Sequence, residues 1–308
     1  MADRDSDSVR YLLRQATTEL AEAGIPSPAD EARLMMMEAL GVSAAWVLIH
    51  PEAEVLPDRV RWFRSGIARR LAHEPFAYIA GHKEFYAFDL QVNPAVLIPR
   101  PETELLVEKA LTLAGKLLER KGRDLLAADL GTGSGAVAIA LAVCQPRLRV
   151  LAIDSSEAAL ALARANAARH YVSDRIEFRY GDLLEGVNER MDLLVANLPY
   201  IPSGEIDGLM PDVRDHEPRE ALDGGPDGTI LIRRTLGQAV ERIGRPGALL
   251  FEIGDGQGRA LMEAASAIYP DATILVNRDY AGFERILTVE LPYGLPSQPV
   301  PSAFPDHR

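Results

Sequence analysis

The 308-residue sequence predicts an α/β protein in which a small helical bundle precedes a doubly wound parallel sheet. Three observations support this class. Apolar residues recur at helical spacing over residues 1–80. Beyond residue 100, short apolar segments alternate with helical ones, an order typical of parallel strands joined by right-handed crossovers. A glycine-rich loop also separates the first of these strands from the helix that follows it.

The N-terminal bundle is expected to contain four helices. Asp7 or Ser8 can cap the first helix, Gly24 ends it, and Pro28 suits the first turn of the second. The segments with helical spacing are residues 9–23, 28–40, a short one from about 43, and 57–71. The fourth helix is rich in arginine, and we interpret its basic residues as a solvated face. These residues are Arg59, Arg61, Arg64, Arg69 and Arg70.

Residues 81–98 are predicted to form a hairpin-like connector, because residues 84–91 are rich in aromatic side chains and Asn93-Pro94 is a turn signal. The α/β domain is expected over residues 99–292. Its helices are expected at residues 103–121, from the glycine loop to 143, from Ser155 or Ser156 to 170, at 230–243 and at 259–268. Its strands are expected at residues 125–129, 150–154, 176–179, 193–197, 248–253, 272–277 and 285–291. No helix separates the last strand from the strand before it, so the last strand can return antiparallel. The proline-rich residues 293–308 are expected to be a disordered tail.

The composition favours a soluble, cytoplasmic protein. The net charge of −12 argues against direct binding to nucleic acid, because a basic face normally neutralises the phosphates. The charged start of the chain lacks the apolar segment of a secretory signal, and no uncharged stretch reaches the roughly 20 residues of a membrane span. The single cysteine, Cys144, fits a reducing compartment and is expected to be a buried helix residue. The six histidines lack metal-ligand spacing, so no metal is predicted.

The glycine-rich loop is the first motif with chemical meaning. Gly131, Gly133 and Gly135 allow a tight turn and let a ligand approach main-chain N–H groups at a helix N-terminus. Asp154 closes the second strand, where a carboxylate can accept both hydroxyl hydrogens of a ribose. Together these features predict a nucleoside-containing cofactor.

Two more acidic residues favour S-adenosylmethionine over a dinucleotide. The glycines alone do not decide, since Gly131, Gly133 and Ala136 also satisfy the relaxed dinucleotide fingerprint. Asp129 precedes the loop, near the expected position of the cofactor's ammonium group. Asp182 follows the third strand and can accept a hydrogen bond from an adenine amino group. Asp182 alone could equally cap a turn, but in register with the other two acids it favours the cofactor interpretation.

The second motif, Asn197-Leu198-Pro199-Tyr200, directly follows the fourth strand, where an open α/β sheet has its binding crevice. An amide nitrogen is a poor nucleophile because its lone pair is delocalised into the carbonyl. A site that methylates such a nitrogen needs acceptors for its two N–H hydrogens. The Asn197 side-chain oxygen and a neighbouring backbone carbonyl supply such a pair, and Tyr200 can wall the planar group. Pro199 keeps Leu198 extended and so fixes the direction of its carbonyl.

With these motifs the sequence resembles the HemK/PrmC family of protein-(glutamine-N5) methyltransferases over nearly the whole chain to about residue 291. The other matching segments are Glu74-Pro75, Gly81, 84–86, 97–104, Glu217-Pro218, 251–254 and 278–280. The resemblance implies a Rossmann-like, seven-stranded class I S-adenosylmethionine-dependent methyltransferase domain at 99–292 and a substrate-recognising bundle at 1–80. It implies methylation of the Gly-Gly-Gln glutamine of class-1 peptide chain release factors. We expect the protein to be a monomer that binds no membrane.

The resemblance also implies the residues of the site. The expected cofactor-binding residues are Asp129, Gly131, Thr132, Gly133, Ser134, Gly135, Asp154, Asp182 and Asn197. Asn197, Leu198, Pro199 and Tyr200 are expected to grip the substrate glutamine and to be the catalytic residues.

One residue departs from the family's pattern, which usually reads Asn-Pro-Pro-Tyr. Leu198 keeps the carbonyl that the chemistry uses, although its less restricted φ can soften the loop. Two related alternatives remain open. The first is a ribosomal-protein glutamine methyltransferase, but residues 97–104 resemble that branch less than the release-factor branch. The second is an adenine-N6 nucleic-acid methyltransferase, which the acidic net charge disfavours. A non-catalytic cofactor-binding adaptor and a dehydrogenase are further alternatives that the intact Asn197–Tyr200 motif argues against.

Overall fold

The computed structural model describes residues 7–294, which form two compact units. The helical unit contains the residues up to His82 together with Met210–His216. The sheet unit contains Lys83–Leu209 and the residues from Glu217 onward. The segment Met210–His216 lies within the range 99–292 that was predicted to be one domain, but it folds with the N-terminal helices. Most of the expected tail, from residue 295, lies outside the described residues.

The N-terminal part of the helical unit contains five helices. They are α1 (Val9–Glu22), α2 (Pro28–Leu40), α3 (Ala44–Ile49), α4 (Pro57–Leu71) and α5 (Phe76–Ala80). Ser8 is the N-cap of α1, and its hydroxyl accepts a hydrogen bond from the Tyr11 N–H at 3.3 Å. The core of the unit is built from apolar side chains of these helices, including Leu12, Leu20, Met35, Met36 and Phe63. The short helix α9 (Pro211–Arg214) also belongs to this unit.

The arginine-rich face of α4 is not uniformly solvated, so our interpretation is wrong for Arg70. Arg70 is buried, because it lies two helical turns after Phe63 on the face that packs into the core. Its guanidinium pairs with Glu31 of α2 at 3.1 Å and with Asp212 of α9 at 3.6 Å. Arg70 therefore connects three helices of the unit.

The sheet unit confirms the predicted α/β class. A two-stranded sheet of β1 (His82–Phe85) and β2 (Phe88–Gln91) precedes the main sheet. The main sheet has seven strands in the order β5-β4-β3-β6-β7-β9-β8. They are β3 (Leu125–Leu130), β4 (Leu148–Asp154), β5 (Ile176–Tyr180), β6 (Met191–Ala196), β7 (Ile243–Glu252), β8 (Thr273–Arg278) and β9 (Glu284–Leu291). The first five pair in parallel, and β9 pairs antiparallel with both β7 and β8, as predicted.

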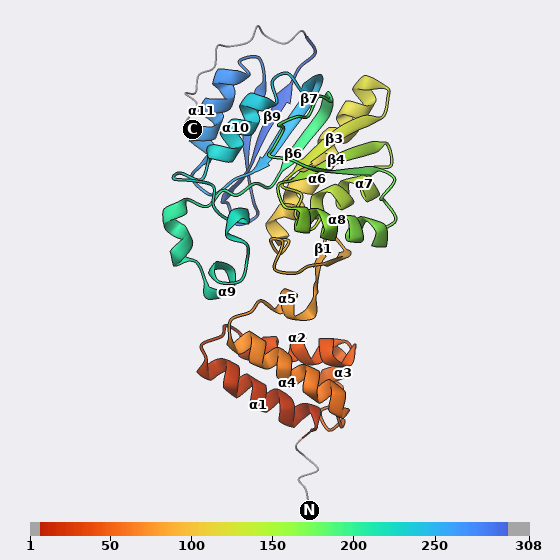
Figure 1. The fold of residues 1–308 in the computed structure, drawn as a ribbon, viewed down its shortest axis with the longest axis vertical. Coiled ribbons are helices and arrows are strands. Elements are labelled where there is room, and N and C mark those ends of the chain that lie inside the picture. Colours follow the sequence, from red (N-terminus) through yellow and green to blue (C-terminus); the bar gives the residue numbers. More distant parts are fainter. Residues whose placement is uncertain (1–6, 295–308) are drawn as a thin grey trace, which may run out of the picture. The chain divides into compact units, whose positions relative to one another are not determined.

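Helices cover both faces of this sheet (Figure 1). One face packs against α6 (Pro101–Lys121), α7 (Ala136–Cys144) and α8 (Glu157–Arg169), the other against α10 (Ile230–Gln238) and α11 (Gly258–Ile268). Because successive side chains of a strand point to opposite faces, Ala127 joins the first core, whereas Ala128 and Leu130 join the second. All of these positions are buried, which explains the nearly continuous apolar runs of the central strands.

The structure differs from the sequence expectations at two helix ends. Helix α10 ends at Gln238, and β7 begins at Ile243, five residues earlier than expected. Gly244 and Pro246 fall between the expected helix and the expected strand, but they lie in a strand whose register with β6 shifts between Met191 and Leu193. Cys144 is exposed rather than buried, because it is the last residue of α7.

The strand order places the switch point of the sheet between β3 and β6. The chain leaves β3 for β4 and β5, and then returns to β6 on the other side of β3. The crevice beyond the carboxyl ends of such strands is where open α/β sheets bind ligands. Between residues 7 and 294, every helix is too short or too polar to span a membrane.

Candidate active site

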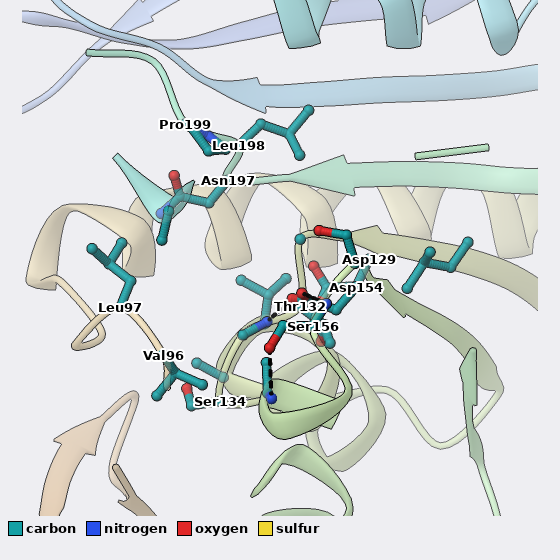
Figure 2. Close-up of a pocket in the computed structure, with 18 of the residues that line it drawn as sticks. Val96, Leu97, Asp129, Thr132, Ser134, Asp154, Ser156, Asn197, Leu198 and Pro199 are labelled. Atoms are coloured by element: carbon teal, nitrogen blue, oxygen red, sulfur yellow. Dashed lines mark hydrogen bonds between the residues drawn. The ribbon is translucent and has the colours of Figure 1, made fainter. Parts of the chain in front are cut away.

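A cavity of about 200 Å³ opens beyond the carboxyl ends of β3, β4 and β6, within the sheet unit. Figure 2 shows Asp129, Asp154 and Ser134 on one side of it and the Asn197–Pro199 segment on the other. Ten predicted site residues line the cavity. They are Asp129, Gly131, Thr132, Gly133, Ser134, Asp154, Asp182, Asn197, Leu198 and Pro199. Gly135 and Tyr200 are the two predicted residues that do not line it.

Asp129 is the penultimate residue of β3 and is 1% exposed. Its Oδ2 accepts hydrogen bonds from the Thr132 hydroxyl at 2.6 Å and from the Ala138 N–H at 3.1 Å. Burial raises the pKa of this carboxyl to about 7, although both hydrogen bonds favour its ionised form. Since these partners are neutral, a cation that enters the cavity would stabilise the carboxylate.

Asp154 closes β4 and fixes the glycine loop. Its Oδ2 accepts a hydrogen bond from the Gly133 N–H at 2.8 Å, and its Oδ1 accepts one from the Ser156 N–H at 2.9 Å. Burial raises the pKa of Asp154, and these backbone donors oppose the shift. The carboxylate thus belongs both to the loop and to the cavity that it lines.

The glycine loop and the Asn197 segment approach each other closely. Gly131 has φ +68°, and a Cβ there would lie 3.2 Å from the Leu198 Cδ2 and 3.5 Å from the Asn197 carbonyl oxygen. Gly135, with φ +83°, is the N-cap of α7, and a Cβ there would meet Ala163 at 3.2 Å. Gly131 therefore permits the approach of the two motifs, whereas Gly135 permits helix packing outside the cavity.

Asp182 lies at an exposed part of the cavity wall, just after β5. Its Oδ2 accepts a hydrogen bond from Arg234 at 2.8 Å, and the same guanidinium reaches Glu185 at 3.2 Å. This ion pair orients the carboxylate at the cavity. Contact of Asp182 with an adenine amino group stays a prediction.

Asn197 is held by a chain of hydrogen bonds that the sequence analysis did not identify. Its Nδ2 donates to the Thr103 Oγ1 at 3.0 Å, and the Thr103 hydroxyl donates to the Glu252 Oε2 at 2.7 Å. The Tyr200 hydroxyl donates to the Glu252 Oε1 at 3.2 Å. Tyr200 thus turns its hydroxyl toward the end of β7, and its place as a wall of the cavity is not supported by the cavity lining.

Burial affects both ionisable members of this chain. Glu252 is 1% exposed, and desolvation raises its pKa. Burial, together with the nearby Glu252 charge, raises the pKa of the Tyr200 phenol well above its usual range, so the phenol keeps its proton. An acid at the end of the apolar run 248–253 was the available signal for Glu252, because an apolar strand seldom ends on a buried carboxylate without a purpose.

The segment before α6 supplies another wall that the sequence analysis did not assign. Val96, Leu97, Pro99 and Arg100 line the cavity. The buried carboxylate of Glu217 accepts a hydrogen bond from the Ile98 N–H at 3.1 Å and pairs with Arg100. Over residues 7–294, no three side chains of His, Cys, Asp or Glu gather as metal ligands would.

Comparisons with known proteins match both parts of the chain. The model of the PrmC N-terminal domain matches residues 11–81, and that of the methyltransferase small domain matches residues 103–210. The release factor glutamine methyltransferase of Moorella thermoacetica is 41% identical over 280 residues, which are 90% of this chain and 96% of the relative. The enzyme of the same name from Rhodopirellula baltica is 35% identical over 301 residues, 94% of this chain and 99% of the relative.

Among solved structures, the hMettl16 catalytic domain in complex with MAT2A 3′UTR hairpin 6 superposes with a TM-score of 0.52. The two chains are 14% identical, and the match covers 76% of this chain and 82% of that one. At this identity the likeness supports a shared fold alone.

Proposed function

This chain is a methyltransferase of the release factor glutamine methyltransferase family, and we propose that it methylates the side-chain amide nitrogen of the Gly-Gly-Gln glutamine in class-1 release factors. The methyl donor is S-adenosylmethionine. The observation that supports this most directly is that the Asn197–Pro199 segment lines the same cavity as Asp129 and Asp154. One cavity therefore offers acceptors for an amide beside acceptors for a cofactor.

The residues of the cavity fit S-adenosylmethionine. The buried carboxyl of Asp129, whose pKa is raised toward 7, suits the cofactor's ammonium group, because a cation there favours ionisation. Asp154 suits the ribose hydroxyls, and Gly131 and Gly133 leave the main chain open to the ligand. When bound, the cofactor supplies an electrophilic methyl group on a positively charged sulfur.

The remaining task of the protein is to hold the acceptor nitrogen. The Asn197 Oδ1 and the Leu198 carbonyl can each accept one N–H hydrogen of the glutamine amide, so that the nitrogen lone pair faces the methyl group. Such positioning lowers the barrier by avoiding the entropy cost of aligning the reactants. The nitrogen becomes acidic as it forms the new bond, so its proton can leave to water without a dedicated base.

Transfer of a radioactive methyl group tests this function. The protein is incubated with methyl-labelled S-adenosylmethionine and, in separate reactions, a class-1 release factor, ribosomal proteins or DNA. We expect label in the release factor, located by mass spectrometry on the Gly-Gly-Gln glutamine. A release factor with that glutamine changed to alanine is the matched control and should stay unlabelled. Label in ribosomal protein or DNA alone would assign the enzyme to one of the alternatives.

A further inference from the structure

The hydrogen-bond chain from Glu252 to Asn197 has a direction. A carboxylate can only accept, so the hydroxyls of Thr103 and Tyr200 must both donate to Glu252. The Thr103 to Glu252 distance of 2.7 Å is typical of a hydroxyl that donates to a carboxylate. Having used its hydrogen, the Thr103 oxygen can only accept from its other neighbour, Asn197, which lies 3.0 Å away.

This direction determines the orientation of the Asn197 amide. Thr103 can accept only from the amino end of that amide, so Nδ2 points to Thr103 and Oδ1 is left for the cavity that Asn197 lines. We propose that Thr103 and Glu252 are positioning residues that fix the Asn197 amide with its oxygen toward the site of the substrate glutamine. The inference rests on the function proposed above, in which that oxygen accepts an N–H of the substrate glutamine.

The opposite orientation would misplace the substrate glutamine amide for methyl transfer. A donor in place of the carboxylate would turn the Thr103 hydroxyl hydrogen toward Asn197, whose oxygen would then rotate to accept it. The Asn197 amino group would face the glutamine amino group, and two donors would oppose each other. The hydrogen bonds of Thr103 and Glu252 therefore place the Asn197 oxygen where it can accept from the substrate, and they exclude the orientation in which the Asn197 amino group would face the substrate.

The surroundings of Glu252 are arranged to keep both hydroxyls donating. Thr103 and Glu102 face it from α6, Tyr200 from the segment after β6, and Arg285 from β9. Arg285 favours the ionised carboxylate, whereas burial and Glu102 oppose it. Of these groups, Tyr200 and Thr103 make the direct hydrogen bonds.

Replacing Thr103 separates the positioning role from packing. Thr103→Val keeps the branched shape but removes the hydroxyl, and we expect kcat for release factor methylation to fall about 100-fold while KM and the S-adenosylmethionine Kd stay unchanged. Thr103→Ser restores the hydroxyl and should restore most of kcat. Thr112→Val is the matched control on the same helix, since the exposed Thr112 hydroxyl donates to the Glu108 carbonyl at 2.9 Å. Wild-type turnover of Thr103→Val, or equal losses in the Val and Ser variants, would overturn the proposal.

A double-mutant cycle gives an independent readout. In an Asn197→Ala enzyme there is no amide to orient, so adding Thr103→Val should cause no further loss of kcat. A structural role of Thr103 would instead lower kcat by the same factor in both backgrounds.

Glu252→Gln provides a second variant if Thr103→Val folds poorly. The amide keeps the shape of Glu252 but can present a donor to Thr103, so we expect kcat to fall while the melting temperature does not, because a costly buried charge has been removed. Wild-type kcat in this variant would contradict the role of Glu252. Absence of release factor methylation by the wild-type enzyme would contradict the proposed function itself, which is a different outcome from either result.

Discussion

At the scale of single residues, Asp129 is the side chain whose protonation the cofactor should change most. Its pKa of about 7 lies above the usual value of an aspartate because the group is buried. Near neutral pH, part of the protein therefore holds a neutral Asp129. A cationic ammonium group at this site favours the carboxylate, and we predict that S-adenosylmethionine binding below about pH 7 releases a proton, with the release fading as the pH rises above about 7.

Calorimetric titration in two buffers of different ionisation enthalpy measures this release. The apparent binding enthalpy of the wild-type protein should differ between the buffers, whereas that of Asp129→Asn should not. Identical heats for the wild-type protein would show that the carboxyl is already ionised or does not meet the cation.

The same shift predicts how stability changes with pH in the cofactor-free protein. The folded pKa is raised, so the unfolded chain loses this proton first, and the free energy of unfolding falls as pH rises from about 4 to about 7. Asp129 lowers the free energy of unfolding by on the order of 4 kcal/mol over this range, and the loss stays constant above pH 7. Urea unfolding across this range should show a shallower decline for Asp129→Asn, and parallel curves would refute the assignment.

Asp154 should matter for the affinity of the cofactor. Asp154→Ala removes the acceptor proposed for the ribose and also releases the Gly133 N–H that now bonds to it. We expect S-adenosylmethionine binding to weaken by about 1–3 kcal/mol, measured by calorimetric titration. The exposed Asp174, outside the cavity, is the control: Asp174→Ala should bind as the wild type does. Unchanged affinity of Asp154→Ala would remove this residue from the site.

The residues of the cavity differ in how visible they are in the sequence. Asp129, Asp154 and Asn197 could be predicted because each follows or ends an apolar strand, and parallel strands bring such ends together. Thr103 and Glu252 lie 149 positions apart and meet only through the packing of α6 on the sheet. The apolar run 248–253 marks Glu252 as an unusual acid, but no local pattern signals its contact with Thr103.

At the scale of helices and strands, periodic segments were predicted well and short or irregular ones were not. The seven strands were all expected, whereas α5 and α9 have too few residues to show a period. The start of β7 was missed because Gly244 and Pro246 are ordinarily turn signals. Pairing with β6 determines the start of β7, and packing determines α5 and α9. Neither effect can be predicted from local propensity.

Helix α4 offers a comparison of two neighbouring arginines. The buried Arg70 pairs with Glu31 and Asp212, and the Asp212 Oδ1 is a buried oxygen with no hydrogen-bond partner within residues 7–294. Arg70→Met should therefore lower the free energy of unfolding by roughly 3 kcal/mol, because it leaves two carboxylates uncompensated. Arg69→Met, which breaks an ion pair of a side chain that is 44% exposed, should cost less than about 1 kcal/mol. Urea unfolding of the two variants checks the contrast, and equal losses would contradict it.

At the scale of the whole molecule, the two units allow recognition and chemistry to be tested separately. Every residue that lines the cavity belongs to the sheet unit. A variant that lacks residues 1–80 should therefore bind S-adenosylmethionine with nearly normal affinity. It should not methylate intact release factor, because the helical unit is proposed to recognise this substrate. Calorimetry and label transfer measure the two properties, and a normal kcat/KM would show that the helical unit has another purpose.

The membership of Met210–His216 in the helical unit has a consequence during synthesis of the chain. The N-terminal helices emerge first, but their unit is complete only after residue 216 has been made. At about 5–20 residues per second, the delay after residue 82 is on the order of ten seconds. Throughout this time Arg70 lacks Asp212, one of its two carboxylate partners. The segment Met210–His216, which ends the delay, comes shortly after Asn197–Tyr200 in the chain. The helical unit begins to fold first, but it is complete only after β3 and β6, the two strands beside the switch point, have been synthesised.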